Sequence, residues 1–96
     1  GMINMKIFQL RNNENCLYFS NHERIDEEII FNEVLEFFKK DKSFTIKDEL
    51  KGPSENIYKC SIGRYNFDLI LDMDYGTFIK SDNRAAIEHL KTYFDN

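Results

Sequence analysis

The sequence predicts an α+β fold, a two-layer sandwich in which a mainly antiparallel sheet of about six strands has two amphipathic helices on one face. Three observations favour this fold. Two segments have apolar residues at helical spacing, several short segments alternate as strands do, and one glycine turn fixes the register of the strands on either side of it. The expected order is ββαββββα. We treat residues 2–96 as one domain and interpret Gly1, which precedes Met2, as the remnant of an expression tag.

A hairpin and a helix are expected first. Residues 5–11 and 16–20 are β-rich, and the residues 12–15 between them are rich in Asn, which favours turns. From Asp26 onward the period becomes that of an amphipathic helix of about four turns, with Asp26 as its N-cap. The apolar face of this helix comprises Ile30, Phe31, Val34, Leu35, Phe37 and Phe38.

The next strand begins with a clear alternation of apolar and polar residues. Phe44 and Ile46 are expected to point to one face of the sheet. Thr45, Lys47 and Glu49 are expected to point to the other face.

A second hairpin has the best-defined register in the sequence. Gly63 begins a two-residue turn, at a position that requires a positive φ. This turn places Tyr58 opposite Leu69 on an apolar face. It places Lys59 opposite Asp68 on the other face. Because a shift by one residue would disrupt both faces, we expect this register and no other.

The last strand and the second helix complete the pattern. After a turn at residues 74–76 the chain returns as a strand, which is expected to place Phe78 on the face of the helices and Ile79 on the opposite face. Ser81 or Asp82 is expected to cap the second helix. The apolar stripe of that helix comprises Ala86, Ile87, Leu90, Tyr93 and Phe94.

Composition narrows the classes of function. The formal net charge is −4, whereas nucleic-acid binding requires a surplus of basic side chains on one face. No apolar run approaches the length of a membrane helix, and the start does not resemble a secretory signal. We therefore expect a cytoplasmic protein that binds neither nucleic acid nor membranes, and the abundance of Lys, Asn and Ile is typical of an A+T-rich bacterial genome. Cys16 and Cys60 lie in apolar segments, where a thiol usually acts as a small buried hydrophobic group.

The residue types that perform chemistry are scattered along the chain, so we expect neither catalysis nor a cofactor. Asp72 and Asp74 form an acidic pair at the end of an apolar strand, but the chain is too short for the enzyme folds in which such pairs bind metal. Neither His22 nor His89 has a second His four residues away or a Glu three residues before it, which are the helical spacings that zinc sites use.

The face of the sheet away from the helices is the candidate for partner binding. The residues we select there are Asp68, Ile70, Asp72, Asp74 and Ile79. Three interpretations of this face stay open. It is a solvated face, or a contact patch for a basic protein or a second copy of the chain, or a face that the first hairpin covers.

Two functions of different classes fit these observations. The first is a small, acidic, cytosolic, non-enzymatic domain that binds a basic protein, such as an immunity or inhibitor protein that neutralises a basic toxin or nuclease. The second is a homodimeric ligand-binding module or a small enzyme, with a pocket between sheet and helices lined by Tyr58, Tyr65, Tyr93 and His22. A domain that only self-associates is a third alternative.

Overall fold

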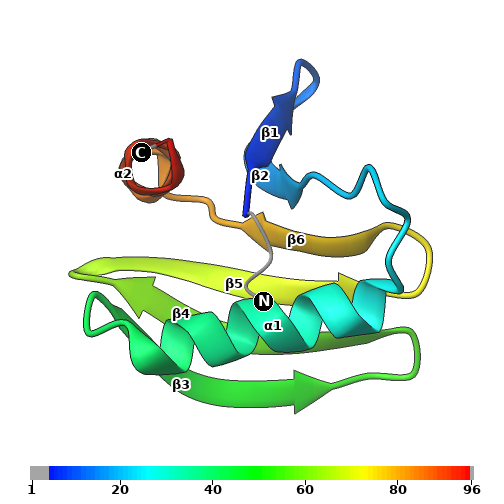
Figure 1. The fold of residues 1–96 in the computed structure, drawn as a ribbon. Helices are drawn as coiled ribbons and strands as arrows, with labels where there is room; N and C mark the ends of the chain where they lie inside the picture. Colours follow the sequence, from blue (N-terminus) through cyan, green and yellow to red (C-terminus); the bar gives the residue numbers. More distant parts are fainter. Residues whose placement is uncertain (1–4, 96) are drawn as a thin grey trace.

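The structure, a computed structural model, describes residues 5–95 and contains one six-stranded antiparallel sheet and two helices (Figure 1). Gly1, interpreted as a tag remnant, lies outside the described residues. The predicted α+β class and the order ββαββββα are confirmed. The elements are β1 (Ile7–Leu10), β2 (Asn13–Phe19), α1 (Glu27–Lys40), β3 (Phe44–Lys51), β4 (Glu55–Ile62), β5 (Tyr65–Asp72), β6 (Gly76–Lys80) and α2 (Arg84–Phe94).

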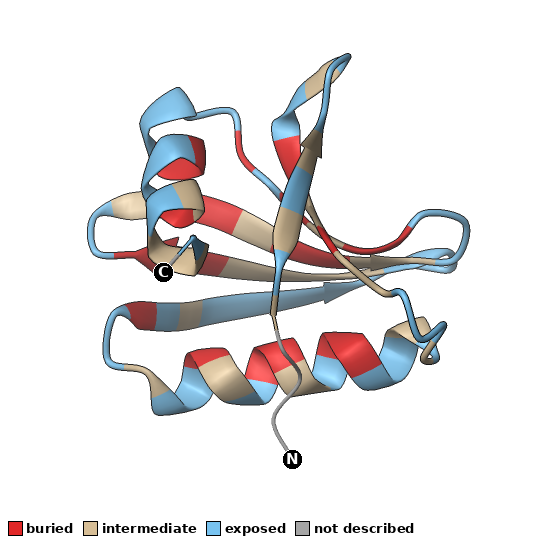
Figure 2. Cartoon of the chain, turned by 45° about the horizontal axis from the view of Figure 1, so that its top comes forward, coloured by how far each residue is buried: buried red, intermediate tan, exposed pale blue. Residues whose placement is uncertain are grey.

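The strands are arranged in the order β1-β2-β6-β5-β4-β3, so β6 joins the first hairpin to the rest of the sheet. Leu17 of β2 pairs with Ile79 of β6, which in turn pairs with Leu69 of β5. These side chains share one buried cluster with apolar residues of both helices, which therefore cover the same face of the sheet. Figure 2 shows the buried side of α1 turned towards the sheet. We call the opposite side of the sheet the open face.

A polar side chain caps the N-terminus of each helix, and only the cap of α1 is the one predicted. Asp26 caps α1 as expected, since its side chain accepts a hydrogen bond from the backbone N–H of Glu28 at 2.9 Å. The cap of α2 is Asn83, which accepts from the N–H of Ala85 at 2.9 Å. The prediction of Ser81 or Asp82 was therefore wrong. Ser81 lies between β6 and α2, where its hydroxyl donates to a backbone carbonyl of β5 and accepts from the N–H of Asn83.

The register of the β4–β5 hairpin is confirmed. Tyr58 pairs with Leu69, Lys59 pairs with Asp68, and Gly63 has a φ of 56°. The first hairpin is tighter than predicted, because Asn13 already pairs with Leu10. Residues 13–15, which were expected in the turn, thus belong to β2.

A bulge in β3 changes which side chains reach the open face. Its register with β4 shifts between Ile46 and Asp48. Before the shift the predicted alternation holds, and after it Glu49 pairs with Tyr58 on the side of the helices. The predicted position of Glu49 was therefore wrong. As a result Leu50 pairs with Ile57 and lies on the open face.

The turn between β5 and β6 corrects a second prediction. Asp72 pairs with Gly76, so three residues form the loop and Leu69 pairs with Ile79. Ile79 is fully buried in the core, with an exposed fraction of 0%. Its assignment to the open face was therefore wrong, and Phe78 lies there in its place. The physical reason is the cross-strand pairing: paired residues share a face, and Leu69, the partner of Ile79, points into the core under the helices. The loop itself has three residues, as predicted, and begins one residue earlier, where the Asp72 carboxylate accepts from two loop N–H groups.

Candidate functional site

A line of apolar side chains crosses the open face with one residue from each strand. Its members, in strand order from β1 to β3, are Phe8, Tyr18, Phe78, Ile70, Ile57 and Leu50, and each pairs with the next. We call this line the apolar row. The ring centroids of Phe8 and Tyr18 lie 5.6 Å apart, and those of Tyr18 and Phe78 lie 5.4 Å apart. Because each side chain contacts its cross-strand neighbour, the row is a continuous line of apolar side chains across the sheet.

The two ends of the apolar row are open to solvent and its centre is sheltered. Phe8 and Leu50 at the ends are 45% and 52% exposed. Ile70 at the centre is only 5% exposed, although it lies on the face away from the helices. Side chains on the open face itself must therefore shelter the middle of the row.

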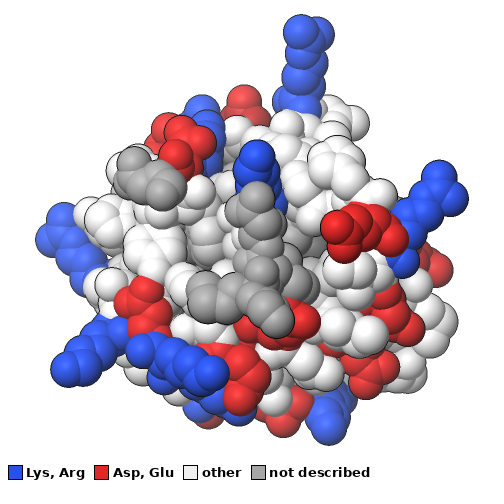
Figure 3. All heavy atoms as spheres, in the orientation of Figure 1, with Lys and Arg blue, Asp and Glu red and all other residues white. Residues whose placement is uncertain are grey.

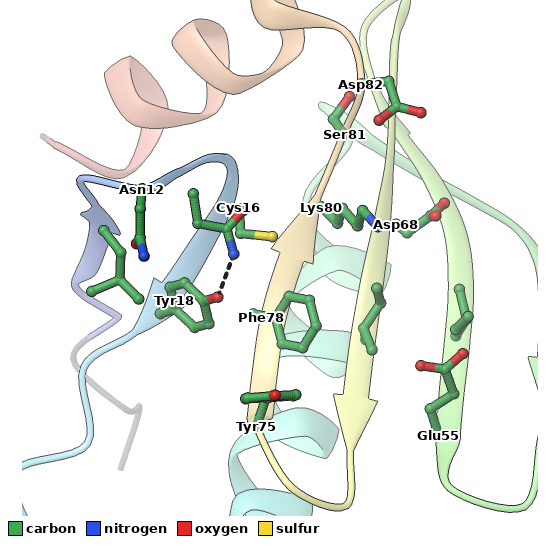
Figure 4. Close-up of a pocket in the computed structure, with 14 residues that line it drawn as sticks. Asn12, Cys16, Tyr18, Glu55, Asp68, Tyr75, Phe78, Lys80, Ser81 and Asp82 are labelled. Carbon is green, nitrogen blue, oxygen red and sulfur yellow. Dashed lines mark hydrogen bonds between the residues drawn. The ribbon is translucent and has the colours of Figure 1, made fainter.

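A groove of 710 Å³ lies over the middle of the apolar row (Figure 4). Residues of the first hairpin, including Leu10 and Asn13, form one wall, while Ile57, Ile70 and Phe78 form the floor. In Figure 4, Tyr18 points from β2 towards Phe78, with α1 behind the sheet. The predicted alternative in which the first hairpin covers this face is thus realised in part, because the hairpin makes a wall and leaves the groove open.

Charged side chains border the apolar row differently on its two sides. On one side the open-face residues of successive strands are Lys80, Asp68, Lys59 and Asp48, which alternate in sign. We call these four residues the mixed flank. On the other side stand Glu55 and Asp72, which pair with each other, followed by Asp74 in the turn. These three residues, all acidic, form what we call the acidic flank.

The acidic character continues around the edge of the sheet. A second hollow of 410 Å³ lies at the start of α1, and its charged lining residues are Asp26, Glu27, Glu28, Glu55 and Asp72 together with Lys51. On the face that Figure 3 shows, side chains of both signs are interspersed. The negative potential is therefore expected to be strongest near the acidic flank.

The structure brings four of the five predicted partner-binding residues to the open face or its edge. Asp68 forms an ion pair of 3.0 Å with Lys59, and Ile70 forms part of the groove floor. The carboxylate of Asp72 accepts from the N–H groups of Asp74 and of the next residue, at 2.8 and 3.0 Å. Asp74 is exposed, whereas Ile79 lies in the core. Of these three acids only Asp68 is paired with a basic side chain, so the predicted patch keeps the charges of Asp72 and Asp74.

Only Ile70 of the apolar row was selected from the sequence. The five members that were not selected are Phe8, Tyr18, Phe78, Ile57 and Leu50. Tyr18 alternates with buried Leu17 and Phe19, which is a signal that it faces away from the core. That signal does not reveal which strand lies beside it. The pairing of β2 with β6 joins segments about sixty residues apart, so local sequence patterns contain no information on it.

Burial raises the pKa of three titratable side chains in or below the groove. It raises the pKa of Tyr18 and of Cys16, which both line the groove. Burial also raises the pKa of Cys60 to about 12, helped by the negative charge of Asp68. Both cysteines are free and buried, as the sequence predicted. At neutral pH these thiols are protonated, and a protonated thiol is a poor nucleophile.

The pocket predicted between sheet and helices is not formed by its proposed residues. Tyr58 packs against Phe31, and Tyr93 donates a hydrogen bond to Asp41. Tyr65 packs against His89, while His22 is exposed ahead of α1. These four side chains do not line a common cavity. The apolar cluster fills the layer between the sheet and the helices. Within residues 5–95, no group of three or more His, Cys, Asp or Glu side chains is arranged to hold a metal ion.

No protein-family model, curated protein or solved structure matches this chain. In the part of the chain that the structure describes, neither helix has the length and apolar character needed to cross a membrane. The candidate site therefore rests on its own geometry, which consists of the apolar row, the groove over it and the two unequal flanks.

Proposed function

We propose that this chain is a non-enzymatic binding domain, which holds an apolar segment of a basic partner protein in the groove of the open face. The single observation that supports the proposal most directly is the apolar row, which crosses six strands and is bordered by charged residues. An apolar centre with a polar rim is the usual anatomy of a protein interface. Extended apolar surface of this kind on a small domain indicates a contact site.

Charge supports a basic partner over a second copy of the chain. The net charge is −4, and three of the carboxylates form the acidic flank beside the apolar row. A basic segment is attracted to this surface, whereas a second acidic copy is repelled by it. Inhibition of a basic toxin or nuclease is one role that such a domain would serve, and it stays a prediction from the sequence.

Two peptides with the same leucine-rich centre, one flanked by lysines and the other by glutamates, test the proposal. Titration of the ¹⁵N-labelled protein should shift the amide signals of Tyr18, Ile57, Ile70 and Phe78 with the lysine peptide. We expect its affinity to be at least about tenfold higher than that of the glutamate peptide, and to fall as salt is added. Equal affinities, or shifts confined to the side of the helices, would contradict the proposal.

Self-association is measured in the same samples by light scattering. A monomer at the concentrations of the titration is the expected result, because both exposed ends of the apolar row lie next to charged residues. A stable dimer that dissociates when Leu50 is changed to Lys would instead assign the open face to a second copy. Leu50 suits this test better than Ile70, because its side chain is half exposed and its replacement leaves the core intact.

A further inference from the structure

We propose that one end of the groove binds a lysine side chain of the partner, with its ammonium group beside the ring of Tyr75 and the carboxylate of Glu55. This inference rests on the proposed function and deepens it, since it names the chemical group of the partner that the groove selects. Three features of the groove support it, namely the charges at its two ends, the aromatic side chains that line it and its apolar floor.

The two ends of the groove differ in charge. Tyr75 and Glu55 lie at one end, at the bottom of Figure 4, and we call this the acidic end. Lys80, Asp68 and Asp82 lie towards the other end. There Lys80, the one basic residue among the described residues that line the groove, pairs with Asp68 across the strands. A cation is therefore attracted to the acidic end, where no base of the groove offsets the carboxylate.

The carboxylate of Glu55 is available to a ligand. It is exposed, and none of the ion pairs within residues 5–95 involves it. Lys51 lines the neighbouring hollow together with Glu55, but its Nζ pairs with Glu49 at 3.8 Å. Asp68, in contrast, already forms an ion pair of 3.0 Å with Lys59. Glu55 therefore offers a charge that the protein leaves without a partner, and Asp68 does not.

Aromatic side chains give the acidic end a second means of binding a cation. Tyr75 is 74% exposed, so most of its ring is open to a ligand. The rings of Phe78 and Tyr18 follow along the groove, with their centroids 5.4 Å apart. A cation within about 6 Å of a ring centroid is attracted to the face of the ring. An ammonium group therefore gains from both ring and carboxylate, and a neutral group of the same size does not.

The floor of the groove suits the stem of a lysine. Phe78 and Ile57, two half-buried members of the apolar row, belong to this floor. A lysine side chain has a charged group at the end of a four-carbon stem, and the stem prefers apolar surroundings. With its stem over Phe78 and its ammonium group near Glu55, a lysine satisfies both requirements. A single side chain enters from the solvent side, so the wall that the first hairpin makes does not obstruct it.

Three short peptides with leucines on both sides of a central residue test which group is recognised. The central residue is lysine, norleucine, which keeps the stem without the charge, or trimethyllysine, which keeps the charge without an N–H donor. Titration of the ¹⁵N-labelled protein gives the three affinities. We expect the norleucine peptide to bind at least about tenfold more weakly than the lysine peptide. The trimethyllysine peptide should bind within about threefold of the lysine peptide, because a ring attracts both cations.

Two pairs of matched variants locate the cation in the groove. Glu55→Gln and Asp82→Asn each remove one exposed carboxylate, at the acidic end and at the other end. Tyr75→Leu and Met73→Leu each replace an exposed side chain of one turn, of which Tyr75 lines the groove.

The first variant of each pair should weaken binding of the central-lysine peptide about fivefold, and the second should change it by less than about twofold. The norleucine peptide should bind all four variants alike, because it has no charge to lose. Thermal unfolding of each variant checks that the fold is retained.

The outcomes separate this inference from the proposed function. Equal affinities of the lysine and norleucine peptides, or equal effects of Glu55→Gln and Asp82→Asn, would overturn the inference and leave the preference for basic segments in place. Loss of binding on trimethylation would overturn the role of the ring and with it the inference. If n-butylammonium alone binds as tightly as the lysine peptide, the site belongs to a free amine and the partner is not its source. Loss of the preference for lysine-flanked over glutamate-flanked peptides would overturn the proposed function itself.

Discussion

At the scale of single residues, Gly76 determines how closely the turn after β5 approaches α1. Its φ is +78°, and a Cβ at this position would lie 2.5 Å from Oε1 of Glu27. The same Oε1 accepts a hydrogen bond from the N–H of Thr77 at 2.7 Å, and the Thr77 hydroxyl donates to the carbonyl of Glu27 at 2.9 Å. Only glycine combines this backbone conformation with the close approach of the carboxylate.

Substitution of this glycine should therefore cost more than substitution of a glycine in an open turn. We expect Gly76→Ala to lower the free energy of unfolding by about 2 kcal/mol, through backbone strain and displacement of Glu27. Gly63→Ala is the matched control, because φ is +56° there and no atom lies within 4 Å of the added Cβ. Its expected cost is about 1 kcal/mol. Urea denaturation measures both, and equal losses would show that the contact with Glu27 is unimportant.

At the scale of elements, one hydrogen bond links the ends of the two helices. The hydroxyl of Tyr93 in α2 donates to Oδ2 of Asp41, the C-terminal cap of α1. This bond lowers the pKa of the Asp41 carboxyl below its ordinary value. Burial, reinforced by the hydrogen bond to Asp41, raises the pKa of Tyr93 to about 12. The two helices are thus coupled through a pair of groups that titrate at opposite ends of the pH scale.

The variant Tyr93→Phe tests this coupling by its dependence on pH. The contribution of Asp41 is present above its ordinary pKa of 3.8 and is lost as pH falls through the lowered value. The contribution of Tyr93 is present below its ordinary pKa of 10.0 and is lost as pH rises towards about 12. We therefore expect Tyr93→Phe to be less stable by about 1 kcal/mol near neutral pH, with a smaller deficit at both extremes. A deficit that stays constant in thermal unfolding from acid to alkaline pH would contradict the coupling.

At the scale of the whole molecule, the pairing of β2, β6 and β5 decides which residues of β6 stabilise the fold. Ile79 is buried between both helices and the sheet, whereas Phe78 lies in the groove and is half-buried. Two adjacent residues of similar apolar character therefore have different roles.

The pair of variants Ile79→Ala and Phe78→Ala should separate these roles. We expect Ile79→Ala to cost about 3 kcal/mol of folding stability, because it leaves a cavity in the core. Phe78→Ala should cost about 1 kcal/mol and weaken binding of the lysine peptide. Chemical denaturation and the peptide titration measure both effects. The reverse order of stabilities would place Ile79 on the open face after all.

The two free cysteines report on unfolding of the whole domain. Cys16 and Cys60 are buried, and burial raises the pKa of both thiols, to about 12 for Cys60. We expect both thiols to react at least about a hundredfold more slowly with a thiol reagent in the folded protein at pH 8 than in urea. Fast reaction of one thiol in native conditions would show that its side of the sheet opens locally.

The sequence by itself determined the class of fold, the order of elements, the cap of α1 and the register around Gly63, because these depend on spacings within about fifteen residues. The sequence also indicated that Ile70, Asp68, Asp72 and Asp74 lie on the face away from the helices. Only the tertiary structure decided that Ile79 lies in the core and that Leu50, Phe78 and Tyr18 complete the apolar row. A one-residue bulge in β3 moves Glu49 and Leu50 to the other face, and the pairing of Ile79 with Leu69 places Ile79 on the side of the helices. The groove depends in addition on the pairing of β2 with β6, a contact between distant segments that local patterns do not encode.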